Sequence, residues 1–161
     1  MLSPALLDEA ASLLDACRAR GVMLAIAESC TGGLIAAALT AIAGSSDVVD
    51  RGFFAYSNEA KTELVGVPAE LIARHGAVSE EVTRAMAEGA LARSRAGIAV
   101  AVTGIAGPGG GSLEKPVGLI WFGVAQRGQN VASEHQLFPG DRTAIRAAAV
   151  AHALAMIRAR L

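Results

Sequence analysis

The sequence predicts an α/β protein whose sheet is mixed, mostly parallel and covered by helices on both faces. Two observations predict this fold class. Short apolar runs, typical of buried strands, alternate with longer segments of helical periodicity, and this alternation is typical of parallel strands joined by crossover helices. Near the C-terminus, two apolar runs are separated only by the turn residues 127–130, which indicates a hairpin and therefore an antiparallel strand.

The first elements are expected to be a helix, a strand and a second helix. Ser3 can cap a helix that has Pro4 at its first position. Apolar residues recur at helical spacing until Gly21, which ends this helix. The apolar run 22–27 predicts a buried strand, and a glycine-containing turn leads from it into a helix over 34–42.

The rest of the chain is expected to form a strand, three helices, a strand, the hairpin and a last helix. These elements are expected at residues 53–56, 58–66, 68–75, 79–95, 98–102, 117–125, 131–138 and 142–160. Asn58 is expected to cap the first of the three helices. Ser79 is a strong helix start, because the two glutamates after it lie where the helix macrodipole favours acidic residues.

Length and composition favour one domain over residues 1–161 and exclude several classes of protein. The 161 residues, 53% of them hydrophobic, suffice for a core. No apolar run reaches the roughly 18–20 residues of a membrane span, and the first residues lack a signal-peptide pattern, so we expect a cytoplasmic protein without a membrane partner. A net charge of −1 and 4% aromatic residues argue against nucleic acid as a partner.

The composition makes one segment stand out. Arginine supplies 12 of the 14 basic residues, and the only lysines are Lys61 and Lys115. Residues 56–61 contain one of these lysines, the only tyrosine and one of the two asparagines. Lysine can lose its proton when it is buried, whereas arginine effectively cannot. The segment is therefore a candidate for chemistry, with chance as the alternative.

Ser29 lies in the turn between the first expected strand and the second expected helix. Free backbone N–H groups at a helix entry attract anions and can form an oxyanion hole. Gly32 and Gly33 allow a ligand to approach the backbone closely. Ser29 is therefore a candidate nucleophile, and the alternative is that the hydroxyl of Ser29 or Thr31 simply caps the helix.

Two residues of the segment 56–61 are candidates for proton transfer. Lys61 is a candidate base for the serine, because a lysine made neutral by burial can accept a hydroxyl proton. Its alternative is a solvated lysine on a helix. Tyr56 is a candidate proton relay or ring support, and its alternative is a core tyrosine.

Two further residues are candidates for ligand binding. Thr103 lies at the carboxyl end of an expected strand, where open α/β proteins bind ligands, and its alternative is a turn residue. Arg142 lies in the first turn of the last helix, where the macrodipole disfavours a cation. This position suggests an anionic partner such as a phosphate, and the alternative is an ion pair with a nearby carboxylate.

The remaining features leave several possibilities open. The glycine-rich loop 104–116 is a candidate lid or a simple connection. Cys30 is a candidate nucleophile or a core thiol. The histidines and cysteines show no metal-ligand spacing, so no metal is expected. A serine–histidine–acid triad stays open, because triads are spatial and not sequential.

Together these motifs resemble the CinA C-terminal domain family, the nicotinamide-nucleotide amidohydrolases. The matching segments span nearly the whole chain in the family's order, at residues 27–33, 43–46, 51–53, 56–61, 75–79, 103–108, 115–118 and 140–142. The resemblance implies a three-layer α/β/α sandwich. It also implies hydrolysis of the carboxamide of nicotinamide mononucleotide to nicotinate mononucleotide and ammonia, without a metal or other cofactor.

The resemblance implies that Ser29 is the nucleophile and Lys61 its base, and it places Tyr56, Thr103 and Arg142 in the site. Arg142 is then expected to bind the 5′-phosphate of the substrate. Ammonia is expected to leave with a proton from Lys61 or Tyr56.

The oxyanion is expected to be held by backbone N–H groups around Thr31, Gly32 and Gly33. The expected partner is a small-molecule nucleotide, and a homo-oligomer is expected because small apolar α/β domains often associate. Two other functions stay open: a serine amidohydrolase of another small amide, and a nucleotide-binding module without turnover.

Overall fold

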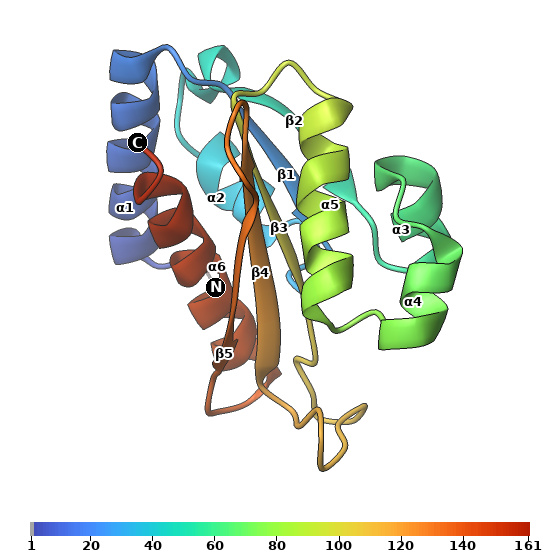
Figure 1. Ribbon diagram of the computed structural model, residues 1–161. Coiled ribbons are helices and arrows are strands. Elements are labelled where there is room, and N and C mark those ends of the chain that lie inside the picture. Colours follow the sequence, from blue (N-terminus) through green and yellow to red (C-terminus); the bar gives the residue numbers. More distant parts are fainter. Residues whose placement is uncertain (1) are drawn as a thin grey trace.

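The computed structural model describes residues 2–161, and its centre is a five-stranded sheet. The strands are β1 (Leu24–Glu28), β2 (Val49–Phe54), β3 (Ile98–Gly104), β4 (Leu119–Gln126) and β5 (Ala132–Leu137). They lie in the order β2-β1-β3-β4-β5 (Figure 1). β1 runs parallel to β2 and β3, whereas β4 runs antiparallel to β3 and β5.

The expected mixed sheet and the expected hairpin are confirmed, but the pairings divide evenly between parallel and antiparallel, so the expected parallel majority is not found. Parallel neighbours need a crossover connection, and helical segments provide one between β1 and β2 and between β2 and β3. No helix connects β3 to β4, and a tight turn connects β4 to β5. The chain therefore reverses direction twice.

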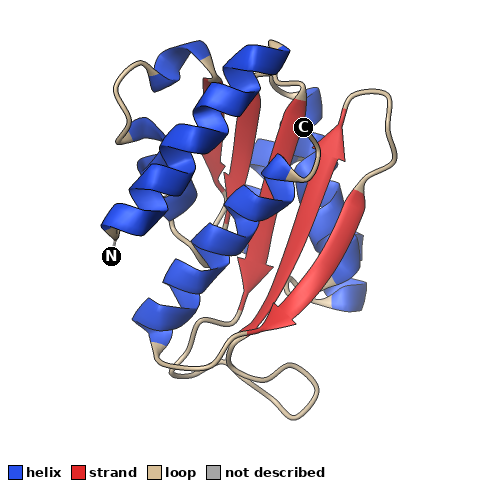
Figure 2. Cartoon of the chain, turned by 90° about the vertical axis from the view of Figure 1, so that its left-hand side faces the viewer, coloured by secondary structure: helices blue, strands red, loops and turns tan. Residues whose placement is uncertain are grey.

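Helices cover both faces of the sheet (Figures 1 and 2). They are α1 (Pro4–Arg20), α2 (Leu34–Thr40), α3 (Asn58–Val65), α4 (Ala69–His75), α5 (Glu80–Ala92) and α6 (Arg142–Arg158), with a short 3-10 helix η1 (Ser45–Asp47). α1, α2 and α6 pack on one face, and α3, α4 and α5 lie on the other. Within residues 2–161, none of these helices has both the length and the apolar character that crossing a bilayer requires.

The helix starts follow the sequence signals with one exception. Ser3 caps α1 and Ser79 caps α5, each hydroxyl accepting a backbone N–H three residues on. α3 differs from the expectation, because Ser57 is its cap and accepts the N–H of Ala60 at 3.0 Å. Asn58 is the first helical residue instead. The extended backbone of Ser57 suits the cap position, where serine and asparagine are about equally favoured.

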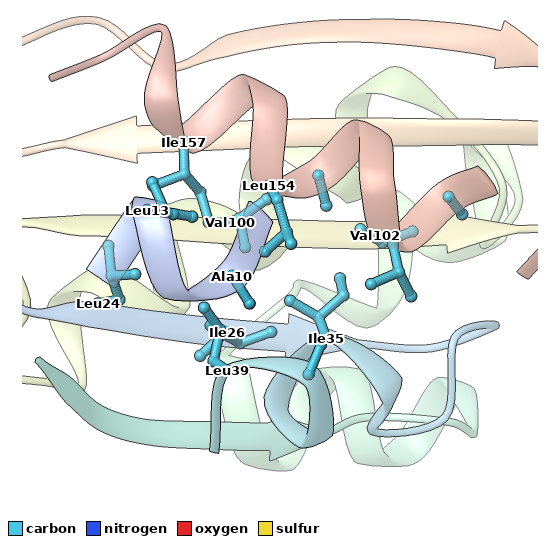
Figure 3. Close-up of a cluster of buried hydrophobic side chains, with 14 of the residues drawn as sticks. Ala10, Leu13, Leu24, Ile26, Ile35, Leu39, Val100, Val102, Leu154 and Ile157 are labelled. Carbon is cyan, nitrogen blue, oxygen red and sulfur yellow. The ribbon is translucent and has the colours of Figure 1, made fainter. Parts of the chain in front are cut away.

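The two faces of the sheet carry side chains of different size. In β1, Leu24 and Ile26 point toward α1, α2 and α6, whereas Ala25 and Ala27 point toward α5. β3 alternates in the same way. Figure 3 shows the large side chains of both strands packed against α1 and α6. The short alanines on the other face allow α5 to lie close to the sheet.

Two strands differ most from their expected bounds, and the expected strand 53–56 lies nearer the N-terminus, so Tyr56 is outside it. β2 begins at Val49 and ends at Phe54, although residues 50–52 have the composition of a turn. Because β2 is an edge strand, its polar side chains find partners beside the sheet, and Asp50 binds the guanidinium group of Arg95 at 2.9 Å. β3 continues to Gly104, so Thr103 is the penultimate residue of a strand and not part of the loop.

Candidate active site

A cavity of about 220 Å³ lies at the carboxyl ends of β1 and β3. α3, the connection between α4 and α5, and the N-terminus of α6 complete its walls. Its lining residues are Ser29, Cys30, Tyr56, Asn58, Lys61, Ala77, Val78, Thr103, Gly104, Ala106 and Arg142. The predicted residues Ser29, Lys61, Tyr56, Thr103 and Arg142 thus come together, whereas Thr31, Gly32 and Gly33 are not among the lining residues.

The central contact of the cavity joins Lys61 to Ser29. The Nζ of Lys61 lies 3.1 Å from the Oγ of Ser29 and 2.9 Å from the carbonyl oxygen of Tyr56. Lys61 is 1% exposed and Ser29 is 7% exposed, so both groups lie inside the protein. The alternative of a solvated lysine is therefore wrong.

The surroundings of Lys61 favour its uncharged form. Burial lowers the pKa of Lys61 from its ordinary value of 10.5, and only the nearby Cys30 opposes this shift. Within residues 2–161, no carboxylate lies within ion-pair distance of the amine. An amine whose charged form is disfavoured in this way is suited to accept a proton.

The turn after β1 is held by Glu28, which the sequence analysis did not select. Glu28 is 2% exposed, and its carboxylate accepts the N–H groups of Gly33, Ile35 and Ala36 at 3.1, 3.0 and 2.9 Å. A carboxylate is favoured at this helix N-terminus, where unpaired N–H groups and the macrodipole meet. Glu28 therefore caps α2 and is not among the residues that line the cavity.

The hydroxyl groups of the turn do not cap α2. Ser29 Oγ contacts Lys61, and Thr31 Oγ1 is buried without a hydrogen-bond partner. The capping alternative for these two residues is therefore wrong.

The backbone N–H groups of the same turn fall into two sets. The N–H of Gly32 donates to the carbonyl of Ser29, and the N–H of Gly33 donates to Glu28. The N–H groups of Cys30 and Thr31 have no acceptor in the part of the chain that the structure describes. Of these two residues only Cys30 lines the cavity, whereas Thr31 is fully buried, and two of the three expected oxyanion donors already have acceptors.

Cys30 lacks the environment of a nucleophile. Burial raises the pKa of its thiol to about 12, so the thiol is protonated at neutral pH. Of the two interpretations of Cys30, the buried environment supports a core thiol and not a nucleophile.

Tyr56 and Arg142 form the mouth of the cavity. Tyr56 is 55% exposed, so the alternative of a core tyrosine is wrong, and its ring centroid lies 5.6 Å from that of Phe54. The Tyr56 hydroxyl lies 3.5 Å from Arg142 Nη2, while Arg142 Nη1 donates to the carbonyl of Gly107 at 2.8 Å. No carboxylate of residues 2–161 pairs with Arg142, so the ion-pair alternative is also wrong.

Thr103 and Lys115 connect the back of the cavity to the α4–α5 region. The buried hydroxyl of Thr103 donates to the carbonyl of Ala77 at 3.0 Å. Lys115, at the end of the glycine-rich loop, donates from Nζ to the carbonyl of His75 at 2.7 Å. The loop is therefore fastened at this end, next to the cavity wall.

The sequence analysis also missed Asn58 as a lining residue and Arg146 as a support. Arg146, on α6, donates from Nε to the carbonyl of Cys30 at 3.1 Å and from Nη2 to the carbonyl of Thr31 at 2.9 Å. Arg146 lies four residues after Arg142 and so on the same side of the helix, which is the signal that could have found it.

Histidine takes no part in the cavity. None of the lining residues is a histidine, and the three histidines contact Glu81, Trp121 and Glu134 elsewhere. A serine–histidine–acid triad is therefore excluded at Ser29. Within the described residues, no group of three or more histidine, cysteine or acidic side chains could hold a metal ion.

The arrangement has the parts that acyl transfer requires. A buried hydroxyl touches an amine whose charged form is disfavoured, and free N–H groups follow the hydroxyl in the chain. A serine and a lysine can serve as nucleophile and base, and backbone N–H groups can hold an oxyanion. The unpaired charge of Arg142 suits an anionic small molecule at the mouth.

Comparison with known proteins places these features in a family. The CinA C-terminal domain family matches residues 7–161. The nicotinamide-nucleotide amidohydrolase PncC of Escherichia coli K12 is 53% identical over 141 residues, which cover 87% of this chain and 85% of that protein. The CinA-like protein of Gemmatimonas aurantiaca is 53% identical over 151 residues, and the match covers 94% of this chain but 35% of that protein. The chain thus spans about a third of the length of some curated relatives that it matches.

Solved structures share the fold over nearly the whole chain. The competence/damage inducible protein CihA from Agrobacterium tumefaciens has a TM-score of 0.96 at 50% identity, and the match covers 99% of this chain and 97% of that one. A CinA superfamily protein from Escherichia coli has a TM-score of 0.92 at 34% identity, covering 100% and 94%. The site, the sequence match and the shared fold agree, and the chain belongs to the CinA C-terminal domain family.

Proposed function

We propose that the chain hydrolyses the carboxamide of nicotinamide mononucleotide to nicotinate mononucleotide and ammonia. The observation that carries this proposal is the 3.1 Å contact between Ser29 Oγ and Lys61 Nζ inside a cavity. The name of the Escherichia coli K12 relative, at 53% identity over most of both chains, supports this choice of substrate. Because a serine and a lysine supply both nucleophile and base, the proposed reaction uses no metal or cofactor.

In the first step, uncharged Lys61 accepts the hydroxyl proton of Ser29 while Ser29 Oγ attacks the carboxamide carbon. The lowered pKa of Lys61 supports this role, because a protonated lysine has no lone pair to accept the proton. The pyridinium charge of the substrate makes its carbonyl group more electrophilic. The same positive charge, close to the amine, also favours uncharged Lys61.

The attack converts the carbonyl oxygen into an oxyanion, and the turn after β1 offers donors for it. The N–H of Cys30, a residue that lines the cavity, is the first candidate, and the N–H of the buried Thr31 is the second, since those of Gly32 and Gly33 have acceptors. Each such donor contributes about 3–4 kcal/mol to lowering the barrier when its geometry suits the transition state. The proposed oxyanion site therefore lies at the start of the turn.

Collapse of the tetrahedral intermediate breaks the carbon–nitrogen bond, and the departing nitrogen takes the proton that Lys61 holds, leaving as ammonia. The Tyr56 hydroxyl contacts Arg142 at the mouth, and the Tyr56 carbonyl contacts the amine, which supports Lys61 rather than Tyr56 as the proton donor. A water molecule then gives a proton to Lys61 and its oxygen to the acyl carbon. The second tetrahedral intermediate collapses by breaking the bond from the acyl carbon to Ser29 Oγ, and Ser29 Oγ takes the proton back from Lys61. The products are nicotinate mononucleotide and Ser29 with its hydroxyl restored.

Arg142 is the proposed partner of the substrate's 5′-phosphate. A second hollow of about 500 Å³ adjoins the cavity through Ala106 and Arg142. Gly140, Asp141 and Thr143 also line it, and the carboxylate of Asp141 accepts the N–H of Ala144. Two donors of the guanidinium group are engaged by Gly107 and Tyr56, and its charge has no carboxylate partner in residues 2–161. A phosphate bound in the second hollow would form an ion pair with the guanidinium group of Arg142.

Incubation of the purified chain with nicotinamide mononucleotide tests the proposal. We expect equimolar ammonia and nicotinate mononucleotide, and no product with Ser29→Ala. Binding of the nucleotide without ammonia release would instead favour the binding module without turnover.

Nicotinamide riboside, which lacks the phosphate, tests the role of Arg142. We expect a lower kcat/KM for the riboside than for the mononucleotide, and Arg142→Ala should remove most of this difference. Equal kcat/KM for the two compounds in the unaltered protein would favour an amidohydrolase of another small amide.

A further inference from the structure

Arg146 contacts the turn that carries Ser29 from the side of α6. Its guanidinium group donates to two successive carbonyl groups, those of Cys30 at 3.1 Å and Thr31 at 2.9 Å. The two bonds link residues more than 100 positions apart in the chain, so they fix the turn to the last helix. Within residues 2–161, no carboxylate pairs with Arg146, and its charge is directed at these backbone oxygens.

The contact with the Cys30 carbonyl also acts on the N–H of Thr31. These two groups belong to one planar peptide unit and point in opposite directions. A hydrogen bond that holds the carbonyl therefore fixes the direction of the N–H. The charge-assisted bond also polarises the peptide unit and strengthens the N–H as a donor. The Thr31 N–H has no hydrogen-bond acceptor within residues 2–161.

Glu28 holds the other end of the same turn. Its carboxylate accepts the N–H groups of Gly33, Ile35 and Ala36. Arg146 binds the carbonyl groups of Cys30 and Thr31, which come earlier in the same turn. The turn is thus fixed by an anion on its N–H groups and a cation on its carbonyl groups. A turn held at both ends keeps its shape when charge develops beside it.

The residue between these supports is a glycine, which the positive φ at this position favours. Gly32 has φ of 63°, and a Cβ built there would lie 2.9 Å from Arg146 Nη2. The guanidinium group therefore lies against the bare backbone of the turn. This close approach is a second sign that Arg146 and the turn are fitted to each other.

We infer that Arg146 is a positioning residue for the hydrolysis, because it fixes the turn that carries Ser29 and orients the peptide units that follow the serine. The inference rests on the proposed function, because it assigns Arg146 a task in the same reaction. Arg146 does not line the cavity and so acts through the peptide unit, not by contact with the substrate.

Arg146→Met tests this inference, since methionine keeps an apolar stem of similar length and removes the guanidinium group. The matched control is Arg158→Met on the same helix, where Arg158 bonds the side chain and carbonyl of Glu9, away from the cavity. We expect kcat to fall between about 10- and 100-fold in Arg146→Met, with KM changed less than about 3-fold. The control should keep the kcat of the unaltered protein.

Amide NMR spectra supply a readout that does not depend on activity. In Arg146→Met we expect the amide resonance of Thr31 to shift and the N–H of Gly32 to exchange faster with solvent, with neither change in Arg158→Met. A kcat within about 2-fold of the unaltered protein would overturn the inference. An equal loss of kcat in both variants would also overturn it, because the loss would then reflect a general loosening of α6.

The proposed function and the inference fail in different ways. If the unaltered protein releases no ammonia from nicotinamide mononucleotide, the proposed function is wrong, and the amide spectra still show whether Arg146 holds the turn. If the protein is active but the Thr31 resonance is unmoved in Arg146→Met, only the inference is wrong.

Discussion

Lys61 and Ser29, 32 residues apart in the sequence, meet at 3.1 Å between Nζ and Oγ. The serine follows a strand, and the lysine lies on a helix that packs against α5. Neither side chain has another side-chain partner in residues 2–161, so their contact depends on how the two elements are placed.

The pH dependence of activity should follow the titration of Lys61. Because burial lowers the pKa of Lys61 below 10.5, kcat/KM should rise with pH through that lowered value and then level off. Lys61→Arg, which keeps the charge but cannot lose it, should lose about 100- to 10,000-fold in kcat/KM. Initial rates of ammonia release across a pH series measure both effects.

The control for this experiment is Lys115→Arg at the only other lysine of the chain. Arginine can still donate to the carbonyl of His75, so this variant should keep the unaltered pH profile. A full rate with Lys61→Arg would contradict the role of Lys61 as base.

Lys61 should also make stability depend on pH. Its folded-state pKa is lower than its unfolded value, so between the two values the unfolded chain binds more protons and stability rises with pH. Lys61→Met should therefore have a higher Tm than the unaltered protein at neutral pH, and the difference should shrink as pH approaches 10.5. Thermal unfolding followed by circular dichroism over a pH series checks this, and a difference that grows with pH would contradict it.

Thr31→Val tests whether the side chain of Thr31 has a role apart from that of its backbone N–H. Thr31 Oγ1 is buried without a partner, and valine has nearly the same shape without the hydroxyl. Stability should be unchanged or rise by about 1 kcal/mol, and kcat should stay within about 2-fold, because the N–H remains. Urea unfolding and steady-state kinetics measure the two quantities. A large loss of kcat would show that the hydroxyl itself takes part.

Glu28→Gln should weaken both the fold and the reaction. Glutamine offers one acceptor oxygen to the three N–H groups that Glu28 now binds, and its NH₂ group would face one of them. The expected cost is about 1–3 kcal/mol of unfolding free energy, together with a lower kcat.

Asp50→Asn is the matched control for Glu28→Gln, because Asp50 is also a buried carboxylate that accepts a backbone N–H. The N–H of Arg95 and the arginines beside Asp50 lower its pKa from 3.8 to about 2. Asp50→Asn should therefore destabilise the protein above pH 3.8, less so as pH falls toward 2, with kcat unchanged. If both variants lost kcat equally, the effect of Glu28 would be one of stability alone.

Gly89→Ala tests how α3 is placed. A Cβ at Gly89 of α5 would lie 1.7 Å from the carbonyl oxygen of Val65, the last residue of α3. Alanine favours a helix by up to about 1 kcal/mol, but this overlap with backbone should cost about 1–3 kcal/mol or more. Because α3 also carries Lys61, we expect a lower Tm and a lower kcat together. Activity retained alongside a lower Tm would show that Lys61 is placed independently of this contact.

The sequence was sufficient to predict the parts that depend on local signals. Glycines and an apolar run marked the strand–turn–helix around Ser29, and the position of Thr103 at the carboxyl end of an expected strand marked it as a candidate for ligand binding. Lys61 was identified because lysine is rare in this chain. Each of these signals lies within a few residues of the feature that it predicts.

What the sequence analysis missed depends on contacts between distant segments. Glu28 and Arg146 bind backbone groups, and any residue supplies the same backbone groups, so no side-chain pattern marks their partners. The even division of strand pairings followed from a connection without a helix between β3 and β4, which a list of apolar runs does not show. The cap at Ser57 instead of Asn58 is a choice between neighbours of about equal preference.

The site has a buried part and an exposed part. Ser29 and Lys61 are enclosed by strand and helix, whereas Tyr56 and Arg142 stand at the surface and touch each other only at 3.5 Å. Substitutions at Tyr56 and Arg142 are therefore expected to change which molecule the cavity binds while the buried contact between Ser29 and Lys61 stays intact. Directed evolution toward new amides should accordingly begin with Tyr56 and Arg142 and keep the interior constant.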